Sequence, residues 1–249
     1  MLNYLSAELY KLVHRRSYMV LSAVFLGLEL LLLLTTGVVS YSYSGNASLR
    51  ESMDVMPMFL LGGILLAPVV AAGTFDDQYG RDTMKNEVAF GVPRRRIYLG
   101  KLLSGAVAGV VLAAVATALY VLLCALFIGV RGSGDLLVSL TAATVTFLCA
   151  VPLWLASLSV TMLLLFWTRS AAASVTASLL SMLLLVPLCI AAPGPGFPAP
   201  KLLWLFQNIY FAAPFWDEPN NLLHCWLVGI GWLAVATVVG VAVFRKKEL

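Results

Sequence analysis

Residues 102–130 read LLSGAVAGVVLAAVATALYVLLCALFIGV, a run without a charged side chain. As an α-helix, about 20 such residues cross the ~30 Å hydrocarbon core of a bilayer, so this run is long enough to span a membrane. Five further apolar runs lie at about 18–39, 55–74, 136–166, 172–192 and 222–244. The sequence therefore predicts an all-α integral membrane protein with six transmembrane helices, in which residues 1–249 form a single transmembrane domain.

The overall composition excludes an ordinary soluble protein. Of the 249 residues, 61% are hydrophobic and 11% are charged, whereas about 25% are charged in a soluble domain. The longest segments outside the spans, 75–101 and 193–221, are too short to hold a soluble catalytic domain. The net charge is only +4, and we expect no nucleic-acid partner. The cysteines have no metal-like spacing, so we expect them to be packing residues: Cys124, Cys149, Cys189 and Cys225.

The basic residues are distributed unequally between the two sides of the predicted bundle. Of the 16 lysines and arginines, 13 fall on one side: Lys11, Arg15, Arg16, Arg81, Lys85, Arg94, Arg95, Arg96, Lys101, Arg169, Arg245, Lys246 and Lys247. The other side has Arg50, Arg131 and Lys201. Because cytoplasmic loops carry the excess of lysine and arginine, this split places both termini in the cytoplasm.

The first 16 residues have the pattern of an amphipathic helix. On a helical wheel, one arc of about 100° is apolar and contains Leu2, Leu5, Leu9, Leu12 and Val13. The polar residues lie elsewhere: Glu8, Lys11, His14 and Arg15. We expect this helix to lie in the cytoplasmic interface with its leucines among the acyl chains. The alternative is that any basic cytoplasmic segment before a span has this composition.

The cytoplasmic loop 75–101 contains signals for a short helix with both ends marked. Asp82 or Thr83 can cap its start, Gly91 supplies a left-handed residue after its end, and Pro93 precedes the helix of the next span. Charges of both signs indicate a docking surface for a cytoplasmic protein. The candidate docking residues are Arg81, Asp82, Thr83, Met84, Lys85, Asn86 and Glu87. A topology determinant or a contact with anionic lipid is the alternative.

The outer segment 193–221 begins with a run of proline and glycine, PGPGFPAP over 193–200, which ends the fifth span. The following residues are aromatic, with Trp204 and Trp216 among them, and too few to cross the membrane. We predict a re-entrant or interfacial helical hairpin with these tryptophans at headgroup level. The alternative is an aromatic loop that packs on the outside of the bundle.

The sequence has no signature of an enzyme. It lacks the GxxxxGKS or GxxxxGKT phosphate loop, HExxH and GxSxG, and its histidines are His14 and His224. We therefore predict no catalytic residue, cofactor or metal in this chain. If ATP drives the protein, another chain binds it.

One ionisable residue, Glu29, lies deep in a predicted span. A charge in a membrane is costly, so such a residue normally faces the bundle interior, a cavity or a partner. Glu29 either contacts a substrate in its path, for instance a cationic one, or is a protonated, hydrogen-bonded acid at a helix or subunit interface. The absence of further buried charges in the spans argues against an ion-coupled carrier.

The order of these parts resembles the ABC-2-type permease, the membrane subunit of ATP-binding-cassette exporters. Residues 8–12 (ELYKL) look like the leader of that family, 80–86 (GRDTMKN) with 91–95 (GVPRR) and Lys101 match its coupling helix, and 201–216 match its outer helix pair. The resemblance implies two permease subunits, identical or homologous, and two copies of a cytoplasmic ATPase that holds ATP and Mg. ATP-driven closure would reach the membrane through the coupling helix.

Within that family, the chain resembles short permeases that give self-immunity against lantibiotics and bacitracin-type peptides. The resemblance implies export of amphiphilic cargo, such as an antimicrobial peptide, a drug or a lipid-like molecule, from a bacterial plasma membrane, with lipids as further partners. Two other classes remain open. One is a membrane scaffold or sensor that docks a cytoplasmic partner, and the other is an ion-coupled carrier.

Overall fold

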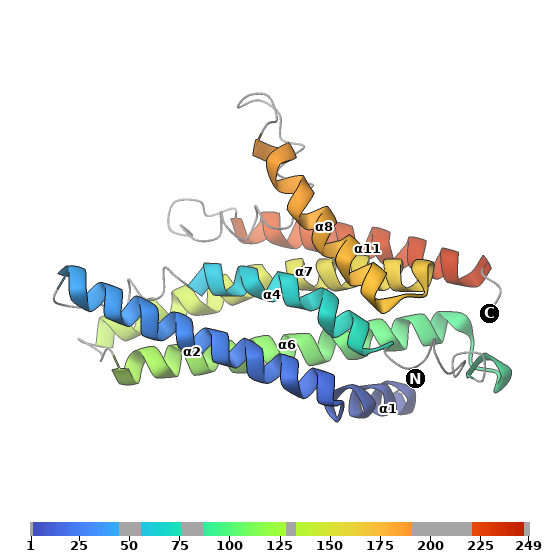
Figure 1. The fold of residues 1–249 in the computed structure, drawn as a ribbon, viewed down its shortest axis with the longest axis horizontal. Coiled ribbons are helices and arrows are strands. Elements are labelled where there is room, and N and C mark those ends of the chain that lie inside the picture. Colours follow the sequence, from blue (N-terminus) through green and yellow to red (C-terminus); the bar gives the residue numbers. More distant parts are fainter. Residues whose placement is uncertain (1, 45–55, 76–86, 128–132, 191–220, 247–249) are drawn as a thin grey trace.

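The computed structural model describes residues 2–44, 56–75, 87–127, 133–190 and 221–246 (Figure 1). Its main helices are α1 (Leu2–Val13), α2 (Arg16–Ser44), α4 (Met56–Gly73), α6 (Arg94–Phe127), α7 (Ser133–Thr168), α8 (Ala171–Ile190) and α11 (Asn221–Lys246). These described segments contain no strand, which confirms the prediction of an all-α protein.

Four helical stretches are long and apolar enough to cross a membrane. They are Arg16–Thr35 in α2, Arg94–Phe127 in α6, Leu136–Thr168 in α7 and Leu222–Lys246 in α11. The other two predicted spans coincide with α4 and α8, which contribute the shorter apolar stretches Gly63–Gly73 and Ala171–Ser181. The multi-pass architecture is thus confirmed, while the full set of six spans stays a prediction.

Helix α6 begins directly after Pro93, so the last part of the predicted loop 75–101 is helical rather than looped. Proline is favoured just before or at the first turn of a helix, because its fixed φ angle fits and its missing N–H is not needed there. The preceding residues also fold as expected, since Gly91 has a φ of 82° and donates its N–H to the Val88 carbonyl oxygen at 3.0 Å.

Figure 1 shows α2, α4, α6, α7 and α11 running roughly along one axis, with α8 leaning away from the others. Both chain termini lie at the same end of this bundle, which we call the basic end (Figure 1). Helix α1, the starts of α2 and α6, the turn from α7 to α8 and the end of α11 all lie there (Figure 1). In the sequence, these segments carry the described basic residues of the predicted cytoplasmic side: Lys11, Arg15, Arg16, Arg94, Arg95, Arg96, Lys101, Arg169, Arg245 and Lys246. The fold therefore brings to one end of the bundle the segments that the distribution of lysine and arginine had assigned to one side of the membrane.

The core near the basic end is built around the ring of Phe166 from α7. Its centroid lies 4.6 Å from that of Phe75, 4.7 Å from that of Tyr98 and 4.5 Å from that of Phe244. This aromatic cluster joins the ends of α4, α6, α7 and α11. Arg94 adds a polar tie, because its guanidinium group donates to the carbonyl oxygens of Phe244 and Arg245 at 3.3 and 3.0 Å.

A second apolar cluster fills the middle of the bundle and includes Phe25, Leu60, Tyr120 and Trp154. Three of the cysteines, Cys124, Cys149 and Cys225, are buried in it. They form no disulfide among the described residues, as expected of apolar packing side chains.

Helix α1 covers the range predicted for the N-terminal helix, but its packing differs from the expectation. The wheel placed Glu8 on the polar face, whereas the structure buries it to 4% exposure. Leu12 is also buried, against the cluster that contains Phe75 and Leu102, instead of lying among acyl chains. The reason is tertiary: α1 packs against α6, which supplies a partner for the Glu8 carboxylate.

Candidate functional site

The candidate docking residues Arg81, Asp82, Thr83, Met84, Lys85 and Asn86 lie outside the described residues. The last residue of the set, Glu87, is described. The chain is also described directly before segment 76–86, at Thr74 and Phe75, and after it, from Glu87 to Pro93. The structure therefore gives the two anchoring points of segment 76–86.

The first anchoring point is the end of α4. Arg15 donates to the carbonyl oxygen of Gly73 at 2.9 Å, and the ammonium group of Lys101 donates to that of Thr74 at 3.3 Å. The same ammonium group lies 5.4 Å from the ring centroid of Phe75, in cation–π range. Since a helix end leaves its last carbonyls without intrahelical partners, these two cations satisfy orphan acceptors and fix the direction in which the chain leaves α4.

The charge of Lys101 is balanced by Glu8 of α1. Lys101 is fully buried, and its Nζ lies 2.8 Å from Glu8 Oε2. The other oxygen of Glu8 accepts from Lys11 Nζ, also at 2.8 Å, and the Lys11 side chain is 53% exposed. Burial alone would raise the pKa of the Glu8 carboxyl, but the charges and hydrogen bonds of Lys101 and Lys11 hold the pKa below its ordinary value.

The second anchoring point is Glu87, which α1 also holds. The Tyr4 hydroxyl donates to Glu87 Oε2 at 2.9 Å. Its ring lies against Gly100, where a β-carbon would collide with it. Burial, with the nearby carboxylates Glu8 and Glu87, raises the pKa of Tyr4, so the hydroxyl stays protonated and donates. Helix α1 thus reaches the chain on both sides of segment 76–86.

Sequence reasoning missed Tyr4, Glu8, Arg15 and Lys101 as anchoring residues. One signal was present, because Glu8 precedes Leu12 by one turn and therefore adjoins the apolar arc of the helix. When the apolar face of the helix packs against protein, a carboxylate beside that face becomes buried and needs a cation from another helix.

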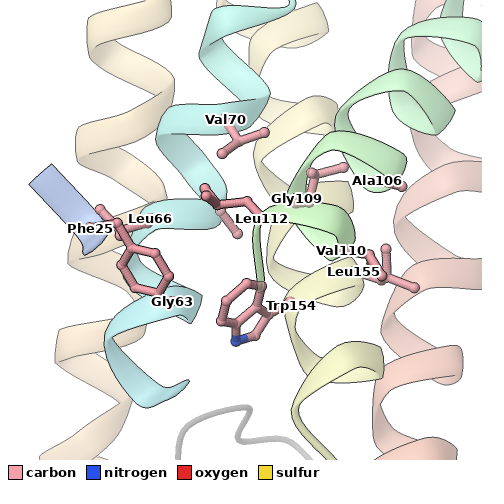
Figure 2. Close-up of a pocket in the computed structure, with 12 residues that line it drawn as sticks. Phe25, Gly63, Leu66, Val70, Ala106, Gly109, Val110, Leu112, Trp154 and Leu155 are labelled. Carbon is pink, nitrogen blue, oxygen red and sulfur yellow. The ribbon is translucent and has the colours of Figure 1, made fainter. Parts of the chain in front are cut away.

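An apolar hollow lies farther along the bundle between α2, α4, α6 and α7 (Figure 2). Its cavity volume is about 20 Å³, which is room for about one water molecule. The lining residues are Phe25, Gly63, Leu66, Ala67, Val70, Ala106, Gly109, Val110, Leu112, Trp154, Leu155 and Leu158. The one polar side-chain group among these lining residues is the indole N–H of Trp154, which donates to the carbonyl oxygen of Leu60 at 3.0 Å. The walls of the hollow are otherwise apolar.

Gly63 makes the position of the Trp154 side chain possible, because a β-carbon at residue 63 would overlap the indole ring. Phe25 meets the same indole edge-on, with ring centroids 6.2 Å apart and an interplanar angle of 71°. The hollow is therefore bounded by aromatic rings from α2 and α7.

The structure places Glu29 inside the protein, on the buried face of α2 between Phe25 and Leu33. Its side chain has 0% exposure, and neither carboxyl oxygen has a hydrogen-bond partner among the described residues. Tyr120 and Cys124 of α6 lie close enough to interact with it electrostatically. The described chain contains no group of histidine, cysteine or acidic residues that could hold a metal ion.

Comparison with known families agrees with this architecture. Residues 4–187, well over half of the chain, match the model of the ABC-2 family transporter protein. The protein belongs to the ABC-2 transporter family and is a membrane component of an ABC transporter. No curated protein matches the sequence. Permeases of this family generally work with a cytoplasmic ATPase subunit and are not catalytic themselves.

Proposed function

We propose that this chain is the permease subunit of an ATP-driven exporter and that Arg81 to Glu87 dock its ATPase. The observation that carries the proposal is the anchoring of segment 76–86 on both sides, through Lys101 and Arg15 at the end of α4 and through Tyr4 at Glu87. A docking segment transmits movement only if its ends are fixed to the helices that must move. Charge-assisted hydrogen bonds that are buried or part-buried supply such fixation.

The complete transporter on this proposal contains two permease subunits, identical or homologous, and two copies of the ATPase, with ATP and Mg bound in the latter. Both termini lie in the cytoplasm on this proposal, because 13 of the 16 lysines and arginines fall on their side of the predicted bundle. A bacterial plasma membrane is the expected location. ATP binding shifts the permease pair between inward-facing and outward-facing packing, so that two states of one assembly account for transport.

The proposed cargo is amphiphilic: an antimicrobial peptide, as in lantibiotic self-immunity, a drug or a lipid-like molecule. The resemblance to short immunity permeases supports the peptide in particular.

The test begins with purification of the chain from its native membrane in mild detergent and identification of stoichiometric partners by mass spectrometry. We expect a protein that contains a phosphate loop. A stoichiometric partner without a nucleotide site would favour a scaffold or sensor, and no partner at all would remove the support for an ATP-driven exporter.

Charge reversal then tests the docking residues. The double variant Arg81→Glu, Lys85→Glu is expected to lose the ATPase on purification, or to retain ATP hydrolysis without efflux of a fluorescent amphiphile from vesicles. Lys246→Glu at the C-terminus of α11 is the matched control, since it reverses a charge at the same end of the bundle. Wild-type copurification and efflux in the double variant would contradict the docking assignment.

A further inference from the structure

A larger cavity lies between the start of α2 and the end of α4, and we call it the interfacial pocket. Its cavity volume is about 110 Å³, whereas that of the apolar hollow is about 20 Å³. A cavity of about 150 Å³ in a protein core accepts a benzene molecule, so the interfacial pocket has room for a short segment of an organic ligand. Helix α2 lines it with Ser17, Tyr18 and Leu21, and α4 lines it with Val69, Ala72 and Gly73 among others.

The interfacial pocket can be reached from the outside of the bundle. Two of its lining residues are exposed, since Ser17 lies on the surface of α2 and Val69 of α4 is 36% exposed. Tyr18 forms a fixed wall, because its hydroxyl donates to the carbonyl oxygen of Ala108 in α6 at 3.0 Å. A ligand would therefore enter from the surroundings of the protein rather than from its core.

Two arginines adjoin the pocket. The guanidinium group of Arg15 donates to the carbonyl oxygen of Gly73, a lining residue, at 2.9 Å. A guanidinium group has five N–H donors, and the described residues offer this one no further hydrogen-bond partner. Arg16 precedes the lining residue Ser17, and its side chain is exposed. Among the described residues that line the pocket, none is acidic, so its surroundings favour an anion.

The pocket lies where the apolar parts of both helices end. The apolar stretch of α2 begins at Arg16, and that of α4 ends at Gly73. Both points are at the basic end of the bundle (Figure 1). In a bilayer, this level is the boundary between the hydrocarbon core and the head groups, where the phosphate and glycerol of a phospholipid lie. The ligand that is most abundant at this depth is thus a lipid.

We propose that the interfacial pocket is a binding site for an anionic phospholipid, with the phosphate on Arg15 and Arg16 and the first part of an acyl chain between α2 and α4. Basic pockets between transmembrane helices on the cytoplasmic side suit anionic lipid head groups. The apolar side chains of Leu21 and Val69 complement the chain, which a free phosphate ion lacks. The inference goes beyond the proposed export function and does not depend on the cargo or the ATPase.

The test uses the protein purified from its native membrane in mild detergent and native mass spectrometry with added lipid. Phosphatidylglycerol and phosphatidylcholine with identical acyl chains are titrated separately. We expect phosphatidylglycerol to bind at least about fivefold more tightly, which is the effect of one arginine near an anionic head group. Glycerol phosphate, which has no acyl chain, should not displace it at equal concentration.

A photoreactive phosphatidylglycerol locates the site. With the reactive group close to the glycerol, it should label peptides that contain residues 17–21 of α2 or 69–73 of α4. The labelled peptides are identified by mass spectrometry. Labelling confined to other helices would overturn the proposal without any variant.

Variants separate the charge from the cavity. Arg16→Gln should reduce the preference for phosphatidylglycerol about fivefold and leave the affinity for phosphatidylcholine within about twofold. Arg96→Gln is its control, because Arg96 is an exposed cation at the start of α6. Ala72→Leu should weaken binding of both lipids, since the larger side chain occupies the pocket. Ala23→Leu is its control, at an exposed position of α2 outside the pocket.

Equal affinity of the wild type for the two lipids would refute the proposal. The same holds if Arg16→Gln keeps the full preference, or if Arg96→Gln lowers it as much, which would indicate a general effect of surface charge. Displacement by glycerol phosphate would indicate a site for a free anion instead of a lipid. Arg16 is exposed, so these results do not depend on whether Ala72→Leu folds.

Discussion

The ammonium group of Lys101 in α6 lies 2.8 Å from Glu8 Oε2 in α1, and 93 positions of sequence separate the two residues. The Glu8 side chain is 3% exposed and that of Lys101 is fully buried. This ion pair fastens the N-terminal helix to the membrane bundle at the point where the chain leaves α4. Two charges removed from water in this way stabilise the contact only while both are present.

Removal of one member of this pair is therefore expected to be costly. Lys101→Met removes one of the two cations that bond to the buried Glu8 carboxylate. We expect the free energy of unfolding to fall by about 3–5 kcal/mol. The double variant Glu8→Gln, Lys101→Met should recover a large part of this loss. Thermal unfolding in detergent measures both. Lys11→Met is the control, since its half-exposed side chain contributes about 1 kcal/mol or less.

A single variant that is as stable as the wild type would mean that the pair contributes nothing to the α1–α6 contact. Equal losses in the single and double variants would mean that packing, rather than charge, explains the effect.

The same pair predicts a dependence on pH. The pKa of Glu8 in the folded protein lies below its ordinary value of 4.5. Its stabilising effect is therefore complete above about pH 4.5 and is lost as the pH falls through the lower, folded-state pKa. The wild type should lose more thermal stability between pH 5 and pH 3 than the double variant Glu8→Gln, Lys101→Met, which lacks the pair. Parallel pH profiles for the two proteins would exclude this contribution.

Tyr4 is expected to matter for coupling more than for stability. Tyr4→Phe removes the hydrogen bond to Glu87 and keeps the ring against Gly100, so we expect a loss of about 1 kcal/mol in stability. ATP hydrolysis should then yield less efflux of a fluorescent amphiphile per ATP. Tyr10→Phe is the control, because Tyr10 lies on the exposed face of α1. An unchanged ratio of efflux to hydrolysis in Tyr4→Phe would show that this anchoring point does not transmit movement.

Gly63 tests the packing of the hollow. Gly63→Ala places a methyl group where the indole ring of Trp154 lies, so either α4 or the ring must shift. Such overpacking costs about 1–3 kcal/mol, which thermal unfolding would detect. Tryptophan fluorescence should change as well. Gly27→Ala, at an open position of α2, should alter neither property. A wild-type unfolding temperature for Gly63→Ala would mean that the indole moves aside freely.

The parts of this fold that depend on local chemistry could be predicted from the sequence. Apolar runs predicted the main helices. Gly91 and Pro93 predicted the turn before α6, because glycine adopts a positive φ without strain and proline has a fixed φ. The grouping of basic residues at one end follows from the alternation of the spans.

The parts of the fold that depend on residues far away in the sequence could not be predicted. A helical wheel treats α1 as an isolated helix, so it assigned Glu8 to the polar face and could not detect Lys101 in α6. The overlap of Gly63 with Trp154 likewise requires the register of α4 against α7, which no local pattern encodes. The environment of Glu29 was left open between a substrate path and an interface, since its burial depends on how α2 meets α6.

Helix α6 is one continuous helix of 34 residues without proline. Lys101 near its start holds the end of α4, whereas Tyr120 lies about 28 Å farther along the axis, beside Glu29. A rigid rod of this kind acts as a lever: a tilt of about 10° at the basic end displaces the far point by about 5 Å. Movement imposed at the basic end would then reach the contact between α2 and α6 directly, without a flexible joint between them.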